Sequence, residues 1–389
     1  MIELAWQWLL EGVAALLLIP VLVLLAETLP GPGRRSGRDV RRPRLAVLIP
    51  AHDEAILIAA TVRSVLSQLE PSDHLLVVAD NCSDDTAAIA TSEGAEAVVR
   101  ADRTRRGKGY ALDFGIQHLE RDPPEMVVIV DADCQLSEGS IDRLARDCCR
   151  TGRPVQALYL MHAPHGAGLK TRIAEFAWIV RNQARPMGLH RVGLPCQLMG
   201  TGMAFPWTTI RSVNLATGHI VEDLKLGLDL ARSGNAPLFC PEALVSSEFP
   251  TSSEGVRSQR ERWEHGHLGT LMSEAPRLLW HALTQLDRNT LTLALDLAVP
   301  PLALLTLLVS GVWCVSAASR AWIALAIASV AATLLATSVL LSWARYARGV
   351  ISLHSLALAA VYALWKIPLY ARFLVARRSN WVRAKRDGG

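Results

Sequence analysis

MVVIVDADC, residues 126–134, joins an apolar run to two closely spaced aspartates. A short run rich in Val and Ile predicts a buried strand. Because side chains two apart in an extended chain point the same way, Asp131 and Asp133 should face one point beyond the end of that strand. Two adjacent carboxylates repel each other unless a cation lies between them, and oxygen ligands suit Mg²⁺ or Mn²⁺. An isolated pair of this kind is more often a solvated loop, so the metal site depends on the surrounding sequence.

Predicted strands and helices alternate around this run. We expect strands at 45–49, 75–78, 97–100 and 126–130, and helices at 54–69, 86–93 and 109–119. Such alternation predicts an α/β fold with a parallel sheet that is covered on both faces. Ligands of these sheets bind beyond the carboxyl ends of the strands. PAHDE (50–54), ADNCSDD (79–85) and DADC (131–134) each follow a strand, so we expect them to meet at one edge.

The polar clusters after the first two strands suit a nucleotide. We expect Asp80 to contact the ligand, since a carboxylate accepts hydrogen bonds from a base or a ribose. Glu54 has a similar place after the first strand, and Ala51 should line the same pocket. Asp84 and Asp85 are instead expected to cap a helix, which is the ordinary role of aspartate there.

Two further clusters supply a lysine and a pair of acids. The glycines of RGKG, residues 106–109, permit a close backbone approach, and Lys108 could meet a phosphate. RGKG is not a P-loop, because it lacks that motif's spacing. VED follows at 221–223, where Asp223, with Glu222 beside it, could take the proton of an attacking hydroxyl as general base. The same acids at a helix start would favour the helix dipole, and both roles can hold.

QRERW, residues 259–263, adds a cation and an aromatic ring. Arg262 could stabilise charge on a leaving diphosphate, and Trp263 could stack on a sugar ring. Without the other motifs, an amphipathic interfacial helix with an anchoring tryptophan is the simpler interpretation.

Apolar residues make up 51% of the 389 residues, and most of the excess lies near the two ends. Residues 4–26, 291–315 and 321–343 are long enough to cross a bilayer, which takes about 20 residues. Residues 350–375 form an interrupted run that we expect to be re-entrant or interfacial. The first run has no basic start and no small-residue cleavage site, so a retained anchor is expected rather than a signal peptide.

The chain is therefore expected to have six parts. These are an N-terminal transmembrane helix (1–29), a basic cytoplasmic linker (30–44), a sheet-containing catalytic domain (45–250), interfacial helices (251–288), two transmembrane helices (289–345) and a re-entrant or third membrane segment with a basic tail (346–389).

Arginines crowd after the first apolar run, at positions 34, 35, 38, 41, 42 and 44. By the positive-inside rule they place the N-terminus outside and the domain in the cytoplasm, in a multi-pass protein of the inner membrane. These arginines supply most of the net charge of +4, and we expect them to favour anionic headgroups of membrane lipids.

Two classes of site are disfavoured. The seven cysteines show no metal-binding spacing, and free thiols are the default for a cytoplasmic domain. No repeat of aromatic and basic residues accompanies the positive charge, so nucleic acid is not an expected partner.

PAHDE, DNCSDD, DAD, VED and QRERW, in this order and between apolar ends, resemble the processive-type family-2 glycosyltransferases. That group includes the synthases of cellulose, hyaluronan and poly-N-acetylglucosamine. The resemblance covers about residues 45–270. It implies a GT-A (Rossmann-like) fold, a nucleotide-sugar donor that is usually a UDP-sugar, and an inverting single displacement.

The resemblance also assigns roles. It implies that Asp80 contacts the base, that Asp131 and Asp133 form the DxD motif with Asp133 the surer metal ligand, and that Asp223 is the catalytic base. Gln259, Arg262 and Trp263 match the QxxRW motif, and Gly200, Thr201 and Gly202 resemble the segment that lines the acceptor terminus.

Some features depart from that pattern. Asp53 stands where the family commonly has asparagine, and Val221 stands where cellulose synthases have threonine. The few membrane helices leave little room for a polymer channel in this chain. We expect transfer to a polysaccharide or a lipid-linked acceptor for cell-surface glycans, with export or polymer-assembly proteins as partners. The alternatives are transfer of a single sugar to a polyprenyl-linked or other lipid-linked acceptor and, less favoured, a sugar nucleotidyltransferase.

Overall fold

The computed structural model describes residues 1–29, 40–216, 221–250 and 253–375, without side chains at 253–260 and 374–375. The chain divides into two compact units. We call them the helical unit (Met1–Gly33, Ala163–Val192 and Arg257–Arg378) and the sheet unit (Arg34–His162, Gly193–Val256 and Ser379–Gly389). Residues 163–192, which we expected within the catalytic domain, belong to the helical unit.

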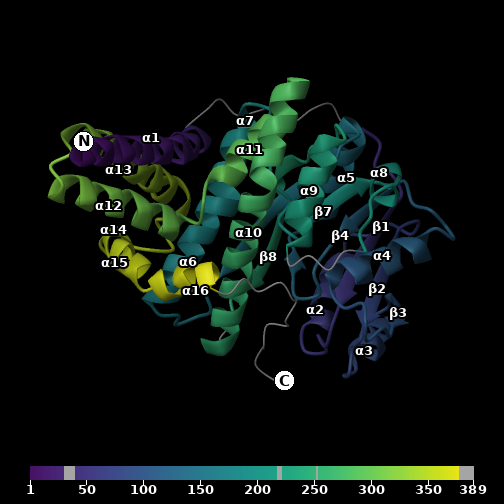
Figure 1. Ribbon diagram of the computed structural model, residues 1–389. Helices are drawn as coiled ribbons and strands as arrows, with labels where there is room; N and C mark the ends of the chain where they lie inside the picture. The colour runs from purple at the N-terminus through teal and green to yellow at the C-terminus, as the bar shows by residue number, and fades with distance from the viewer. Residues whose placement is uncertain (30–39, 217–220, 251–252, 376–389) are drawn as a thin grey trace. The chain divides into compact units, whose positions relative to one another are not determined.

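One sheet of eight strands organises the sheet unit (Figure 1). The strands are β1 (Leu45–Ala51), β2 (His74–Asp80), β3 (Glu96–Arg100), β4 (Met126–Ile129), β5 (Gln135–Leu136), β6 (Val155–His162), β7 (Met203–Pro206) and β8 (Leu238–Glu248). Their order is β3-β2-β1-β4-β7-β6-β8-β5. The first four strands are parallel, as expected, but β7 runs antiparallel to both β4 and β6. The sheet is therefore mixed: β6 and β8 also pair in parallel, and the antiparallel pairs are those that involve β7 and β5.

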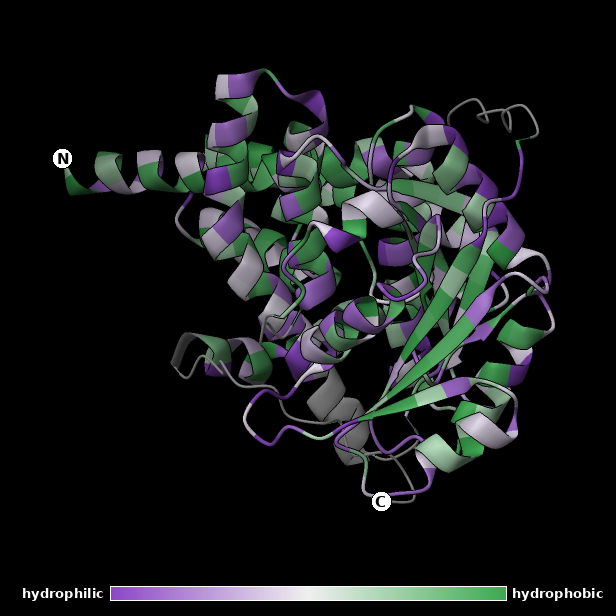
Figure 2. Cartoon of the chain, turned by 90° about the vertical axis from the view of Figure 1, so that its right-hand side faces the viewer, coloured by the Kyte–Doolittle hydropathy of each residue, from purple (hydrophilic) through white to green (hydrophobic). Residues whose placement is uncertain are grey.

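The strands are mostly apolar, as their green colour in Figure 2 shows. Their apolar side chains alternate between the two faces of the sheet. Ala46 and Leu48 belong to a core cluster with side chains of α4, α8 and α9, whereas Val47 and Ile49 are also fully buried and point to the other face. The helices of this unit are α2 (Ile58–Leu66), α3 (Thr86–Ser92), α4 (Lys108–Leu119), α5 (Ser140–Thr151), α8 (Trp207–Arg211) and α9 (Glu222–Arg232). Both faces of the sheet are thus covered, as its continuous apolar runs predict.

The pairing register brings the strand ends together. Ala51 of β1 pairs with Ala79 of β2, and Leu48 of β1 pairs with Ile129 of β4. The residues that follow, Asp80 and Asp131, therefore leave the sheet at the same edge.

The helical unit contains α1 and a long C-terminal series. Its elements are α1 (Ile2–Thr28), α6 (Leu169–Ile179), the π-helix η1 (Val180–Ala184), α7 (Arg185–Arg191), α10 (Ser253–Gln285), α11 (Arg288–Ala298), α12 (Leu302–Ala318), α13 (Trp322–Ser342), the π-helix η2 (Trp343–Ala347), α14 (Leu353–Ala357), α15 (Ala359–Leu364) and α16 (Ile367–Val375). The first four residues of α10 fall in the sheet unit.

Three stretches of the described chain have the length and apolar character of a membrane span: Ile2–Thr28, Trp322–Ala347 and Leu353–Phe373. The first and second match the runs expected at 4–26 and 321–343. The run expected at 291–315 is instead split between α11 and α12, which are bent by 69°. Pro300 and Pro301 lie at this break and have no amide hydrogen to continue a helix.

A charged cluster is buried inside the helical unit. Arg185 of α7 donates from Nε to Glu27 of α1 (2.5 Å) and from Nη2 to the side chain (2.5 Å) and backbone (2.7 Å) of Asp296 in α11. The three side chains are 4–8% exposed. The cation meets a carboxylate on each side, so the cluster ties three segments that are distant in sequence.

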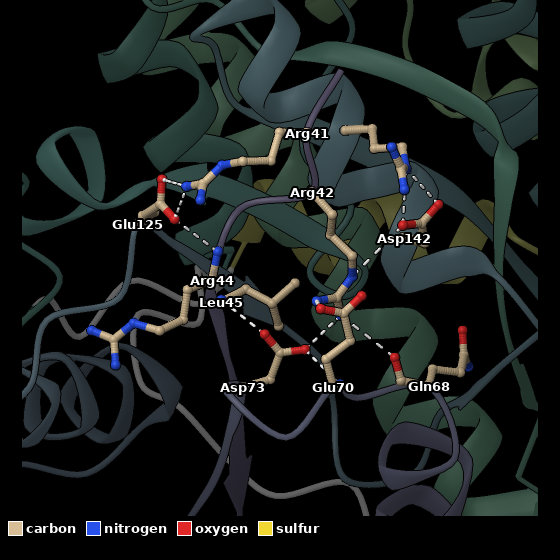
Figure 3. Close-up of polar contacts among 10 residues, drawn as sticks. Arg41, Arg42, Arg44, Leu45, Gln68, Glu70, Asp73, Glu125 and Asp142 are labelled. Carbon is tan, nitrogen blue, oxygen red and sulfur yellow. Dashed lines mark hydrogen bonds and ion pairs between the residues drawn. The ribbon is translucent and has the colours of Figure 1, made fainter. Parts of the chain in front are cut away.

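The arginines before β1 pack onto the sheet unit (Figure 3). Arg42 is buried and donates to Asp73, whose side chain is fully buried (2.6 Å). Arg41 and Arg44 pair with Glu125 and Asp122 in more exposed positions. We expected these arginines to attract anionic headgroups, but carboxylates of the domain already engage all three. Arg34, Arg35 and Arg38 lie outside the described residues.

Candidate active site

Asp131 and Asp133 lie just beyond β4, and both are half-buried. Ligand atoms of these two carboxylates and the Cys134 thiol all lie within 4.8 Å of one another. Burial raises the pKa of the Cys134 thiol well above its usual range, so the sulfur stays protonated and is a poor ligand. The two carboxylates remain, and their hard oxygen atoms fit Mg²⁺ or Mn²⁺.

Lys108, the first residue of α4, points at the same place. Its ammonium group pairs with Asp131 and donates to the backbone oxygen of Gly200 (2.6 Å). Burial lowers the pKa of Lys108, but the carboxylates of Asp131, Glu222 and Asp223 outweigh it and raise the pKa above its ordinary value. Lys108 is therefore a fixed cation between the DxD pair and the Gly200 segment. A contact with a phosphate remains a prediction.

The glycines of GTGMAF form a tight turn beside Asp223. Gly200 has a φ of +94°, which a residue with a side chain rarely adopts. A Cβ atom at Gly200 would lie 3.1 Å from Oδ2 of Asp223 and 3.7 Å from Nζ of Lys108. Thr201 is fully buried, and its hydroxyl accepts a hydrogen bond from the backbone N–H of Asp131 (3.0 Å). The expected base thus lies against the expected acceptor segment, and that segment is bonded to the DxD motif.

Glu222 and Asp223 occupy the first turn of α9, where acids favour the helix dipole as well. Burial raises the pKa of Glu222 to about 7, and the neighbouring charge of Asp223 adds to this effect. Both acids line a small cavity of about 30 Å³. Its other polar lining residues are Lys108, Asn214, Lys225 and Asp229. Space for a few polar atoms therefore lies directly beside the acidic pair.

Asp80 ends β2 and is 6% exposed. It accepts hydrogen bonds from Arg100 of β3 (2.5 Å) and from the side chain of Asn81 (2.9 Å). Asn81 has a φ of +53°, a strained conformation that is frequent at functional sites. A ligand that bonds to Asp80 would share this carboxylate with Arg100.

The first motif closes the same edge. Ala51 is buried at the end of β1, and the backbone N–H of Glu54 donates to Thr86 (2.8 Å). Asp84 accepts from the backbone N–H of Thr86 (3.1 Å), as expected of a capping residue, whereas Asp85 occupies the N-cap position of α3 without a capping bond from its side chain. All the predicted donor-site residues therefore belong to the sheet unit.

The QRERW motif lies on α10 and belongs to the helical unit. Arg262 and Trp263 are half-buried, and the Trp263 ring packs on that of Trp178 in α6 with centroids 4.7 Å apart. The side chain of Gln259 lies outside the described residues. The roles expected for these three residues remain predictions.

Two residues of this edge were missed in the sequence. Arg100 ends β3 as Asp80 ends β2, and the pairing register sets them opposite each other. Gln156 is fully buried in β6 and bonds to Met199 and Thr201. A polar residue inside the apolar run VQALYLM was the available signal for Gln156, since a buried amide needs hydrogen-bond partners.

Comparison with known proteins gives a family match and similar folds. The family model described as glycosyltransferase like family 2 matches residues 43–266. The probable glycosyltransferase YdaM of Bacillus subtilis is 24% identical over 237 residues, which cover 58% of this chain and 55% of that protein. The chain thus matches about half the length of that curated relative.

Two solved structures are among those that match. The mannosyltransferase PcManGT from Pyrobaculum calidifontis, in complex with GDP-Man and Mn²⁺, matches with a TM-score of 0.54 and 18% identity, over 94% of this chain and 95% of that one. Glucosyl-3-phosphoglycerate synthase from Mycobacterium tuberculosis, in complex with Mn²⁺, UDP and phosphoglyceric acid, matches with a TM-score of 0.37 and 22% identity, over 54% and 76%.

These findings confirm the expected GT-A fold with flanking apolar helices. The matched region contains the whole acidic edge described above, which favours the glycosyltransferase interpretation over a sugar nucleotidyltransferase. With more than half of its length matched by the family model, this chain belongs to the glycosyltransferase-like family 2.

Proposed function

We propose that the protein transfers a sugar from a nucleotide-diphosphate sugar to a polysaccharide or lipid-linked acceptor, with inversion, during the synthesis of cell-surface glycans. A UDP-sugar is the first donor to test, because the motif set resembles UDP-dependent synthases. A GDP-sugar is the second, since PcManGT was solved with GDP-Man.

One observation carries this proposal: four carboxylates gather around one lysine at a single edge of the sheet. Lys108 pairs with Asp131 and is influenced by Glu222 and Asp223. Asp133 lies beside Asp131. A cluster of acids of this size favours the binding of further positive charge.

A divalent cation would supply that charge. Asp133, with help from Asp131, would hold it through carboxylate oxygens. When bound, Mg²⁺ or Mn²⁺ would neutralise charge that develops on the donor diphosphate. Asp80, Glu54 and Ala51 would contact the nucleotide at the neighbouring strand ends.

Asp223 would act as the general base. It would accept the proton of the acceptor hydroxyl as that oxygen attacks the anomeric carbon from the side opposite the diphosphate. The turn at Gly200–Gly202 would form the floor of the acceptor site, because Gly200 leaves the space in front of Asp223 free of a side chain. Arg262 and Trp263 would assist the leaving diphosphate and the sugar ring.

The membrane position belongs to the same proposal. The apolar helices would anchor the protein in the inner membrane with the N-terminus outside. A lipid-linked acceptor or a growing glycan would then meet the site at the cytoplasmic surface. Further export or assembly proteins would handle a long product.

Transfer of a single sugar to a lipid-linked acceptor is the second candidate. The three candidate spans of the described chain leave little room for a polymer channel, and this favours it. The two candidates share the donor site and differ in product length.

The test is a panel of UDP- and GDP-sugars with Mg²⁺, Mn²⁺ or a chelator, using membranes that contain the full chain. Released nucleotide identifies the donor, and the size and anomeric configuration of the product separate a polymer from a single addition and inversion from retention. Absence of nucleotide release with every donor, at preserved nucleotide binding, would contradict the proposal.

A further inference from the structure

Gln156 is a polar side chain with no exposure to solvent, and its described hydrogen bonds all reach backbone groups. Its Oε1 accepts from the N–H of Met199 (2.8 Å). Its Nε2 donates to the carbonyl oxygens of Thr201 (2.9 Å) and Ala157 (2.8 Å). Gln156 therefore binds the turn on both sides of Gly200. A buried amide is costly without partners, so this geometry is strongly held.

The same turn receives hydrogen bonds from three other places in the sheet unit. The N–H of Ala157 donates to the oxygen of Gly202 (2.8 Å), and Lys108 donates to the oxygen of Gly200 (2.6 Å). The N–H of Asp131 donates to the hydroxyl of Thr201 (3.0 Å). Among these four bonding partners of the turn, Gln156 alone bonds to two backbone groups of the turn through its side chain. It is also not expected to contact the substrate.

Gln156 lies where the pairing of its strand is irregular. β6 pairs with β7 through Val155 and Gln156, and its register with β8 shifts between Ala157 and Leu158, where the extra residues are in β8. Irregular pairing of this kind is common next to active sites. Gly202 is packed so closely that a Cβ there would lie 2.8 Å from Cβ of Ala157. The turn thus has little room, and Gln156 fixes where it lies.

We propose that Gln156 is a positioning residue of the transfer reaction, acting through the Met199–Gly202 turn. By holding both sides of Gly200, it sets the gap between that backbone and Asp223, where the attacking hydroxyl must lie. This inference rests on the proposed function of Asp223 as base. Loss of Gln156 should therefore slow transfer while leaving the nucleotide end of the site intact.

Gln156→Met tests the proposal on the full chain, because methionine keeps the length and volume of the side chain but forms none of its hydrogen bonds. Ser140→Ala is the matched control. Ser140 is also fully buried and bonds through its hydroxyl to both backbone groups of one residue, Leu244, away from the turn. Both variants lose a buried side-chain link between two segments.

We expect Gln156→Met to lower kcat on the order of 10²-fold, because a small misplacement of the reacting groups has a cost of this size. The Kd for the nucleotide should stay within about 2-fold of wild type. Ser140→Ala should keep the kcat of the wild type, although it should lose about as much thermal stability as Gln156→Met. Equal kcat values in the two variants, or a parallel loss of nucleotide affinity in Gln156→Met, would overturn the inference.

Amide hydrogen exchange of residues 199–202 provides a readout that does not need a substrate. Exchange should accelerate in Gln156→Met and stay unchanged in Ser140→Ala; unchanged exchange in both would exclude the proposed hold on the turn. Failure of the wild-type protein to transfer any sugar would instead reject the proposed function, and the exchange result would still decide how Gln156 acts.

Discussion

The helical unit and the sheet unit each contain a cluster of charges, and the two are balanced differently. Arg185 meets Glu27 and Asp296, and all three side chains are 4–8% exposed. Lys108 meets Asp131 with side-chain exposures of 18% and 30%, and Asp133, Glu222 and Asp223 add further acids nearby. The first cluster is closed and its cation is saturated. The second is open to solvent and rich in acids, which suits a site that binds a cationic group and a substrate.

Asp223→Asn tests the open cluster most severely. We expect the rate of sugar transfer to fall about 10²–10⁴-fold, because the amide cannot accept the proton of the attacking hydroxyl. Nucleotide binding should stay unchanged, since the side chain keeps its size. Turnover and nucleotide affinity are measured on the same preparation, and near-wild-type turnover would show that the base lies elsewhere.

Arg185→Met tests the closed cluster. Removal of the guanidinium leaves the carboxylates of Glu27 and Asp296 buried without their cationic partner, which should cost about 3–5 kcal/mol of stability. Lys108→Met should instead cost little stability and most of the activity, since its partners reach solvent. Thermal unfolding in detergent compares the two variants. Similar stability losses in both would remove the distinction between the clusters.

Asp133→Asn sharpens the charge argument. Mutation of residues that only hydrogen-bond to a metal ligand typically lowers metal affinity by about 10–100-fold. Loss of a charged ligand should therefore raise the Mn²⁺ concentration for half-maximal activity by about 10²-fold or more. Asp113→Asn is the control. Asp113 lies on α4, and its carboxylate accepts a hydrogen bond from the side chain of Gln117. A metal requirement that is the same in Asp133→Asn and wild type would place the cation elsewhere.

Glu222→Gln should change how stability depends on pH. The raised pKa, about 7, means that the folded protein binds more protons than the unfolded chain between its ordinary value near 4.5 and 7. Wild-type stability should therefore fall as pH rises through this window. The variant lacks this penalty and should be more stable by on the order of 1 kcal/mol at pH 8, with no difference below about pH 4.5. Denaturation in the presence of a chelator measures it, and a difference that grows toward low pH would contradict the sign.

Arg41→Gln should have the smallest effect. Its pair with Glu125 is exposed, at 76% and 49%, and such pairs contribute about 0–1 kcal/mol. Arg42→Gln should cost more stability, because the side chains of Arg42 and Asp73 are only 7% and 0% exposed. Denaturant midpoints of the two variants are compared, and equal midpoints would mean that burial does not decide the strength of these pairs.

Much of the acidic edge was predictable from local sequence. Apolar runs locate β1, β2, β3 and β4, and parallel strands must end at one edge, so Asp80 and Asp131 could be placed together without a structure. The second half of the sheet was not predicted. β7 enters antiparallel from distant sequence, and nothing local in its four residues, Met203–Pro206, specifies that partner.

Long-range pairing also explains the missed contacts. The neighbours of Lys108, Asp131 and Gly200, come from other elements, so RGKG does not reveal them, while its expected contact with a phosphate stays a prediction. Gln156 bonds to residues more than 40 positions away. The bend between α11 and α12 was predictable in principle, because Pro300 and Pro301 interrupt a run that hydropathy alone makes continuous.

The absence of a side chain at Gly200 has a consequence for engineering. Any other amino acid there would direct its first carbon toward Asp223 and would also have to adopt a left-handed backbone, so this position is closed to redesign. New acceptor preferences would have to be introduced from the cavity wall, where Val213, Asn214 and Leu215 line the same cavity as the two acids.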